Sequence, residues 1–237
     1  MKRFAAAACV AAALLVPGSA FAQDPTTPNT QPAQGSSSSS KSGFSSWVAD
    51  SWAGGAGGVV ITKRTGGELY GEVGKTNVWH NLDFSIEAGW MSSVVNQHRI
   101  DSAGAIANYL AQSQGQTASS TIKVPAGYGA FNVRRTVYST QKYDVYALGG
   151  LGFAVTSPKT TFVLGGTDVS GSLDQYGVTL GKDLAGHSTS ALLNLGAGVT
   201  VPFGQWFGDV SYRFTPIFTA NQSTKVSRFN FGVARRF

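Results

Sequence analysis

Hydrophobic and polar residues alternate strictly along the last thirteen residues of the chain, 225–237. Phe229, Phe231, Val233 and the terminal Phe237 fall on one phase of this alternation, while polar or small residues fill the other phase. Only a β-strand sends successive side chains to opposite faces, so this pattern predicts a strand with one apolar face and one polar or small face.

The same alternation recurs through the rest of the chain. It is clear in residues 82–91, 143–155, 191–203 and 206–218, and it is less regular in residues 58–64, 68–79 and 130–138. Together with 225–237 these segments make eight predicted strands. The fold class that they favour is all-β, an eight-stranded antiparallel transmembrane β-barrel with lipid outside and a polar interior. A secreted β-sandwich is the alternative.

The N-terminus has the layout of a secretion signal. Lys2 and Arg3 precede an apolar run from Phe4 to Val16, and a small-residue site, Ala20-Phe21-Ala22, follows. We predict a signal peptide at 1–22 with Sec-type cleavage near Ala22, and hence a location in the outer membrane of a Gram-negative-type bacterium. The only cysteine lies inside the predicted signal, which excludes disulfide and Cys-nucleophile chemistry from the mature chain.

Composition supports a lipid-facing protein. Only 13% of residues are charged and 30 are glycine. Without Lys2 and Arg3 the basic count falls from 18 to 16 against 12 acids, which leaves a net charge of +4 with no basic run, so no nucleic-acid partner is expected.

The segment between the signal and the strands is poor in apolar residues. Residues 23–43 are rich in Pro, Thr, Gln and Ser, which predicts a disordered periplasmic tether, and residues 44–53 have aromatics at roughly helical spacing that suit a short helix or a plug. The glycine-rich stretch 53–58 is predicted to be a flexible joint. The predicted organisation is therefore signal at 1–22, tether at 23–53 and barrel at 54–237.

The predicted connections differ in length between the two ends of the strands. Those near 79–81, 139–142 and 204–205 are tight, whereas 92–128 and 156–189 are long and polar. Short turns of outer-membrane barrels face the periplasm, and aromatic rings collect at the membrane interface. We expect such an aromatic girdle at the periplasmic rim from Trp79, Tyr143, Phe203 and Trp206, with Tyr138 and Phe237 beside them.

Four segments resemble the small outer-membrane barrel families, the group of the OmpA transmembrane domain, OmpW and the opacity proteins. These are residues 146–153 (YALGGLGF), 195–199 (LGAGV), 210–214 (VSYRF) and 232–237 (GVARRF). The resemblance implies a barrel over about 54–237. It also implies that Phe229, Phe231, Val233 and Phe237 resemble the signal read by the barrel-assembly machinery, although Arg235 departs from the apolar pattern. Outer-membrane lipid and lipopolysaccharide are the other expected partners, and any extracellular partner is left unknown.

Charged residues occupy the inward phase of several predicted strands. Eight strands leave an interior just wide enough for side chains, so these acids and bases are expected to pair and close the lumen. The candidates for salt bridges are Glu87, Asp209, Arg213 and Arg228, with Arg213 pairing with Glu87 across the lumen or with Asp209 on its own strand. A gate that re-pairs to pass ions is the alternative. The full inward set is Asp83, Glu87, Arg134, Asp144, Asp209, Arg213, Arg228 and Arg236.

Catalytic and cofactor chemistry is not expected. His187 and Ser188 are adjacent, so they face opposite sides of a strand, and the only later acid, Asp209, belongs near the other rim. A lipid-modifying hydrolase using His187 is therefore the weakest alternative. The glycines of 150–152 and 196–198 are interpreted as small lumen residues that make room for bulky neighbours. No metal-ligand spacing occurs. Residues 160–167 and 175–180 are predicted to extend the barrel as a hairpin. The expected role is thus non-enzymatic, in envelope structure or surface interaction, with a narrow channel for ions or small apolar solutes as runner-up.

Overall fold

The computed structural model describes residues 49–181, 183–219 and 223–237. The predicted signal, the predicted tether up to residue 48, and the aromatics Phe44 and Trp47 of the proposed helix lie outside the described residues. No helix in the described part of the chain is long and apolar enough to cross a membrane.

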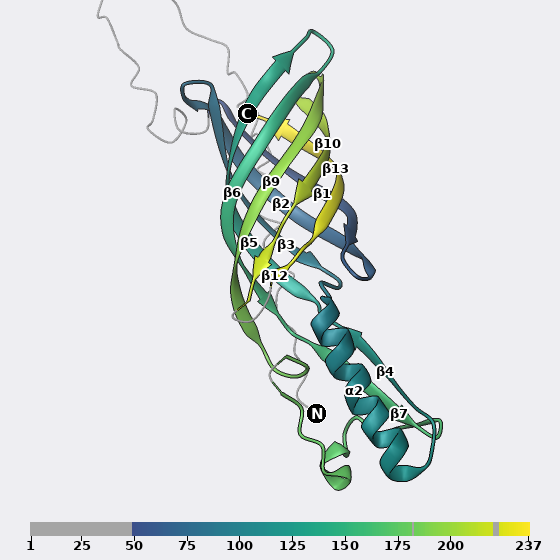
Figure 1. Ribbon diagram of the computed structural model, residues 1–237. Coiled ribbons are helices and arrows are strands. Elements are labelled where there is room, and N and C mark those ends of the chain that lie inside the picture. Colours follow the sequence, from purple (N-terminus) through teal and green to yellow (C-terminus); the bar gives the residue numbers. More distant parts are fainter. Residues whose placement is uncertain (1–48, 182, 220–222) are drawn as a thin grey trace, which may run out of the picture. The chain divides into compact units, whose positions relative to one another are not determined.

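Eight antiparallel strands close into a barrel (Figure 1). The sheet runs β10-β13-β1-β2-β3-β5-β6-β9, and β9 pairs with β10 to complete the ring. The predicted fold class is confirmed. The strands are β1 (Ser51–Ile61), β2 (Thr65–Trp79), β3 (Leu82–Met91), β5 (Ala126–Ser139), β6 (Asp144–Thr156), β9 (Ser188–Phe203), β10 (Trp206–Phe214) and β13 (Ser227–Arg236).

The first strand was placed wrongly by the sequence. It spans Ser51–Ile61 rather than 58–64, so residues 51–53 are not helical and the glycine-rich stretch 53–58 is not a flexible joint. Gly58 explains why glycine suits this strand, because a Cβ there would lie 2.1 Å from the carbonyl oxygen of Phe229 on β13. The glycines of β1 thus permit close approach to the neighbouring strand.

Tight turns gather at one end of the barrel, which we call the hairpin end. His80 and Asn81 join β2 to β3 with φ of 46° and 62°, and Gly204, with φ of 72°, joins β9 to β10. Positive φ at such positions is typical of two-residue hairpin turns. The opposite end, which carries the longer connections and also the short turn 62–64 between β1 and β2, is called the loop end.

The longer connections fold into a second element group, which the sequence did not predict. It contains α2 (Gln97–Gln114), β4 (Ala118–Lys123), β7 (Lys159–Leu164), β8 (Thr167–Asp168) and the 3-10 helix η1 (Leu173–Tyr176), and α2 lies against β4 and β7 (Figure 1). The remaining short strands, β11 (Ile217–Phe218) and β12 (Ser223–Thr224), extend the edge of β9. The strand predicted at 206–218 is divided at Thr215-Pro216, since proline has no N–H to donate to a ladder.

The hairpin predicted between 160–167 and 175–180 does not form. β7 pairs with β4, from the other long connection, and residues 173–176 form η1 instead. Helix α2 begins at Asn96, whose side chain accepts a hydrogen bond from the Arg99 N–H at 3.0 Å, and ends at Gly115 with φ of 61°. Both are standard helix-capping arrangements.

A continuous apolar core joins the loop end of the barrel to this group. Val60, Met91 and Ile217 from the barrel side belong to the same buried cluster as Leu110 of α2 and Phe162 of β7. The loop end of the barrel is therefore filled with apolar side chains rather than left open.

Candidate functional site: the charged lumen

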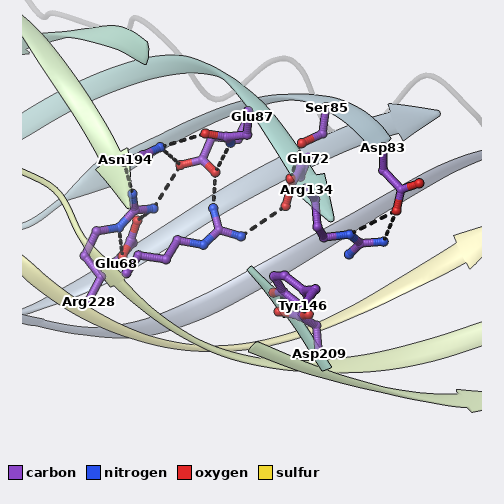
Figure 2. Close-up of polar contacts among 12 residues, drawn as sticks. Glu68, Glu72, Asp83, Ser85, Glu87, Arg134, Tyr146, Asn194, Asp209 and Arg228 are labelled. Carbon is purple, nitrogen blue, oxygen red and sulfur yellow. Dashed lines mark hydrogen bonds and ion pairs between the residues drawn. The ribbon is translucent and has the colours of Figure 1, made fainter. Parts of the chain in front are cut away.

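A network of acidic and basic side chains fills the middle of the barrel (Figure 2). Arg228 of β13 is fully buried, and its Nε donates to Glu68 Oε2 at 2.8 Å while its Nη2 donates to Glu87 Oε1 at 3.1 Å. Nη2 also contacts Glu68 Oε1 and the hydroxyl of Tyr128. The guanidinium of Arg228, on β13, thus reaches past β1 and connects a carboxylate on β2 with a carboxylate on β3.

Arg213 of β10 is the second cation of the network. Its Nη1 contacts Glu87 Oε2, and its Nη2 lies 3.2 Å from Glu72 Oε2. The structure therefore brings Arg213 to Glu87, one of the two partners that the sequence suggested, and to Glu72, which the sequence did not suggest. Charge-assisted contacts of this kind are the stronger class of hydrogen bond.

Asp209, the other suggested partner of Arg213, lies elsewhere in the lumen. Its Oδ1 accepts a hydrogen bond from the Tyr146 hydroxyl at 2.8 Å (Figure 2). Closer to the hairpin end, Arg134 pairs with Asp83 at 3.3 Å. Both pairs lie between the central network and the mouth of the barrel.

Neutral polar groups complete the network. Asn132 donates to Glu87 Oε2 at 2.8 Å, and Ser85 donates to Glu72 Oε1 at 2.6 Å. The Tyr128 hydroxyl donates to Glu68 Oε1 at 2.5 Å. Most of the network's hydrogen-bonding capacity is satisfied in this way, which a buried ion pair requires, although the buried Nε of Arg213 has no partner.

Free space is scarce between the network and the hairpin end. A cavity of about 20 Å³, lined in part by Tyr70, Glu72 and Arg213, has room for about one water. A larger cavity of about 390 Å³ lies at the hairpin-end mouth, and its lining includes Asp83, Arg134, Asp144 and Arg236. All four residues therefore point into the barrel, as the sequence predicted, and they surround its mouth.

Small residues on the inner wall make room for bulky neighbours. At Gly198 a Cβ would lie 2.5 Å from the Tyr146 hydroxyl, and at Gly196 it would lie 3.1 Å from the side chain of Arg213. This is the role that the sequence suggested for these glycines.

Replacing Gly198 by Ala is expected to lower the free energy of unfolding by about 1–3 kcal/mol, because the added methyl overpacks against Tyr146. Urea unfolding in lipid vesicles measures the difference. Gly149→Ala is the matched control, since nothing lies within 4 Å of a Cβ at Gly149. Equal losses in the two variants would contradict the packing role of Gly198.

The outer wall is apolar. Large side chains exposed on it include Leu69, Ile86 and Leu151, at 67%, 60% and 69% exposure. Phe229, Phe231, Val233 and Phe237, the predicted assembly signal, are also exposed. The residues of the predicted girdle are exposed at strand ends that meet at the hairpin end; they are Trp79, Tyr143, Phe203 and Trp206.

The histidines are not gathered in the lumen. His187 Nδ1 lies 2.7 Å from the Ser157 hydroxyl, and Ser188 instead bonds to Thr156 at 2.8 Å. His98 Nε2 lies 3.8 Å from Asp183 near the start of α2, where burial lowers the pKa of Arg99 and the Asp183 carboxylate opposes that shift. Within the described ranges no three His, Cys, Asp or Glu side chains are placed to hold a metal ion.

The sequence missed part of the site. Glu68 and Glu72 lie on β2. Leu69 and Val73 are apolar and face outward, so the alternation of a strand places residues 68, 70 and 72 inward, and this pattern could have identified both glutamates. The sequence also did not point to three uncharged polar residues of the network. These are Tyr128, Asn132 and Asn194, whose side chains carry no charge to mark them as partners in an ion pair.

A closed eight-stranded barrel with an apolar outer wall and a charged interior defines a small transmembrane β-barrel of the outer-membrane type.

Solved structures similar to this chain are barrels of that type. The N-terminal β-barrel domain of Pseudomonas aeruginosa OprF is 13% identical with a TM-score of 0.47, covering 80% of this chain and 98% of that one. Neisserial surface protein A is 14% identical with a TM-score of 0.44, covering 79% and 96%, and Yersinia pestis Ail, the attachment invasion locus protein, is 12% identical with a TM-score of 0.38, covering 79% and 96%. At 12–14% identity the similarity extends to the fold and no further. No protein-family model and no curated protein sequence matches the chain.

Proposed function

We propose that this chain is an outer-membrane barrel with a structural or surface-interaction role and a lumen closed by its salt bridges. The observation that carries the proposal is the network around Arg213 and Arg228, in which two guanidiniums contact Glu68, Glu72 and Glu87. A small cavity adjoins it on the side of the hairpin end, and apolar residues such as Met91 and Ile217 fill the loop end. This leaves little path for solutes.

In this proposal the hairpin end faces the periplasm and the loop end faces the exterior. The folded group of α2, β4 and β7 then forms the extracellular part that meets partners, because binding functions are commonly carried by connections on a rigid scaffold. The proposed role needs no catalytic group. Secretion through cleavage near Ala22 and insertion by the barrel-assembly machinery belong to the same proposal.

A narrow ion channel is the second candidate, and the excess of acids in the lumen favours it. The central network holds three carboxylates against two guanidiniums. If this lumen opened, that excess would favour cations over anions. The two candidates differ in whether the barrel conducts at rest.

Planar-bilayer recording of the purified full-length protein tests the proposal. The unmodified protein is expected to give no steady current, whereas Arg213→Ala is expected to lower the melting temperature or to raise the conductance, because it removes the guanidinium between Glu72 and Glu87. Lys142→Ala, in the turn before β6, is the control and is expected to stay silent. A steady current from the unmodified protein would favour the channel, and a silent, equally stable Arg213→Ala variant would contradict the closing role of this pair.

A further inference from the structure

The β5–β6 ladder of the barrel continues into the β4–β7 ribbon without a change of register. Ala126 pairs with Thr156 in the barrel and Lys123 pairs with Lys159 in the ribbon, so the pairing offset is the same. Between them the Ser157 N–H donates to the Pro125 carbonyl at 3.0 Å. Since the ladder is continuous, side chains that face outward on the barrel keep that phase on the ribbon.

The outward face of this ribbon changes abruptly in character. On the barrel it carries Leu151, Phe153 and Val155, all exposed to the surroundings of the outer wall. Beyond Val155 the same face carries Ser157, then Lys123 opposite Lys159, then Thr121 opposite Thr161. Hydrocarbon-facing residues are thus followed at once by a pair of ammonium groups and hydroxyls.

The height of the lysine pair suits the headgroup layer. Lys159 lies four residues beyond Val155, which is about 13 Å along a strand and roughly 10 Å along the membrane normal at a tilt of about 40°. The polar layer on each side of a bilayer is about 5–8 Å thick. Measured from Val155, the lysine backbone therefore lies slightly above this layer. A lysine stem about 6 Å long that lies back along the apolar surface brings the ammonium down into the layer.

The lysine pair is arranged to receive an anion. Lys123 and Lys159 are direct cross-strand partners and both are exposed, and like charges placed directly opposite each other are destabilising. Neither takes part in an ion pair with another described residue. Exposed His187, immediately before β9, is held by its contact with Ser157 at 2.7 Å, next to the same face.

We propose that the face formed by Lys123, Lys159, Ser157 and His187 binds the phosphate groups of lipopolysaccharide in the outer leaflet. The inference rests on the proposed orientation, with the loop end outside. Its chemical basis is charge complementarity between two ammonium groups and a phosphate, directly above a face that contacts acyl chains. The site would hold the barrel at a fixed depth and tie the β4–β7 ribbon to the glycolipid layer.

Binding of detergent-solubilised full-length protein to lipopolysaccharide tests the proposal. The double variant Lys123→Gln/Lys159→Gln is expected to bind about thirtyfold more weakly, because each basic residue near an anionic surface contributes about fivefold. Lys142→Gln, in a turn at the other end of the barrel, is the matched control and is expected to bind like the unmodified protein.

Two further probes separate the sources of phosphate. Lipopolysaccharide stripped of its phosphates is expected to bind the unmodified protein as weakly as the intact glycolipid binds the double variant. Equal binding of stripped and intact glycolipid, or of the double variant and the unmodified protein, would overturn the site. Complete competition by millimolar inorganic phosphate would assign it to a free anion instead of the glycolipid.

Failure of this site and failure of the proposed function give different results. Binding is measured in detergent and needs no membrane insertion. Insertion is scored separately, as a folded, protease-resistant barrel in lipid vesicles. A barrel that inserts but ignores the lysine substitutions refutes only the phosphate site.

Discussion

Replacing Arg228 by Met is expected to lower the free energy of unfolding of the barrel by about 3–5 kcal/mol. The substitution removes the guanidinium that contacts Glu68 and Glu87. Glu87 keeps its contact with Arg213, but the buried Glu68 carboxylate loses the cation that pairs with it, and an uncompensated buried charge carries a penalty of this size. Methionine retains much of the volume, so little of the loss arises from a cavity. Reversible urea unfolding in lipid vesicles, followed by tryptophan fluorescence, measures the change.

Two companion variants identify the source of that loss. Glu68→Gln combined with Arg228→Met is expected to recover part of the stability, because it removes the carboxylate that Arg228→Met leaves without a cation. Arg235→Met, at the exposed end of β13, is expected to change stability by less than about 1 kcal/mol. If Arg228→Met and Arg235→Met were equally mild, the buried network would not be a major source of stability.

The barrel itself was predictable because its physical signal is local. An outward apolar side chain at every second position identifies a strand wherever the alternation is unbroken, as at 82–91, where prediction and structure share the same bounds. This alternation is harder to recognise where glycines stand in a strand, because glycine has no side chain to mark either face. In β1 this moved the predicted start of the strand by seven residues, from 51 to 58.

The phase of β2 was lost for a related reason. Gly71 and Gly74 interrupt its alternation, and the pairing with β3 shifts register between Lys75 and Trp79, where Asn77 has φ of 52°. A bulge adds a residue to one strand, so the alternation changes phase there and does not identify which residues of the whole segment face inward. Glu68 and Glu72 therefore went unnoticed, although they supply two of the three carboxylates of the central network.

The loop-end group could not be derived from local patterns alone. β4 and β7 come from different connections and pair directly with each other. They are brought into register by the β5–β6 pair, which lies between them in the sequence and whose ladder they continue. Helix α2 did carry local signals, with Asn96 before it, Gly115 after it, and Ala103, Ala107 and Leu110 at helical spacing. Those signals were overlooked because the segment was judged by its polar composition.

The remaining strong prediction concerns the outer wall at mid-height. Leu151→Arg is expected to lower the free energy of unfolding in vesicles by about 2–4 kcal/mol, because it places a charge on the lipid face near the centre of β6. Tyr143→Arg, at the hairpin-end rim of the adjoining turn, is expected to cost only about 0–1 kcal/mol, since charge is tolerated near the interface. The difference in unfolding free energy between these two variants distinguishes the barrel from the secreted β-sandwich. In a water-soluble protein a leucine that is 69% exposed could be replaced by arginine at a cost within about 0.5 kcal/mol, and the two variants would then be alike. A depth-dependent penalty at residue 151 thus tests, in one measurement, whether the outer wall is in contact with hydrocarbon.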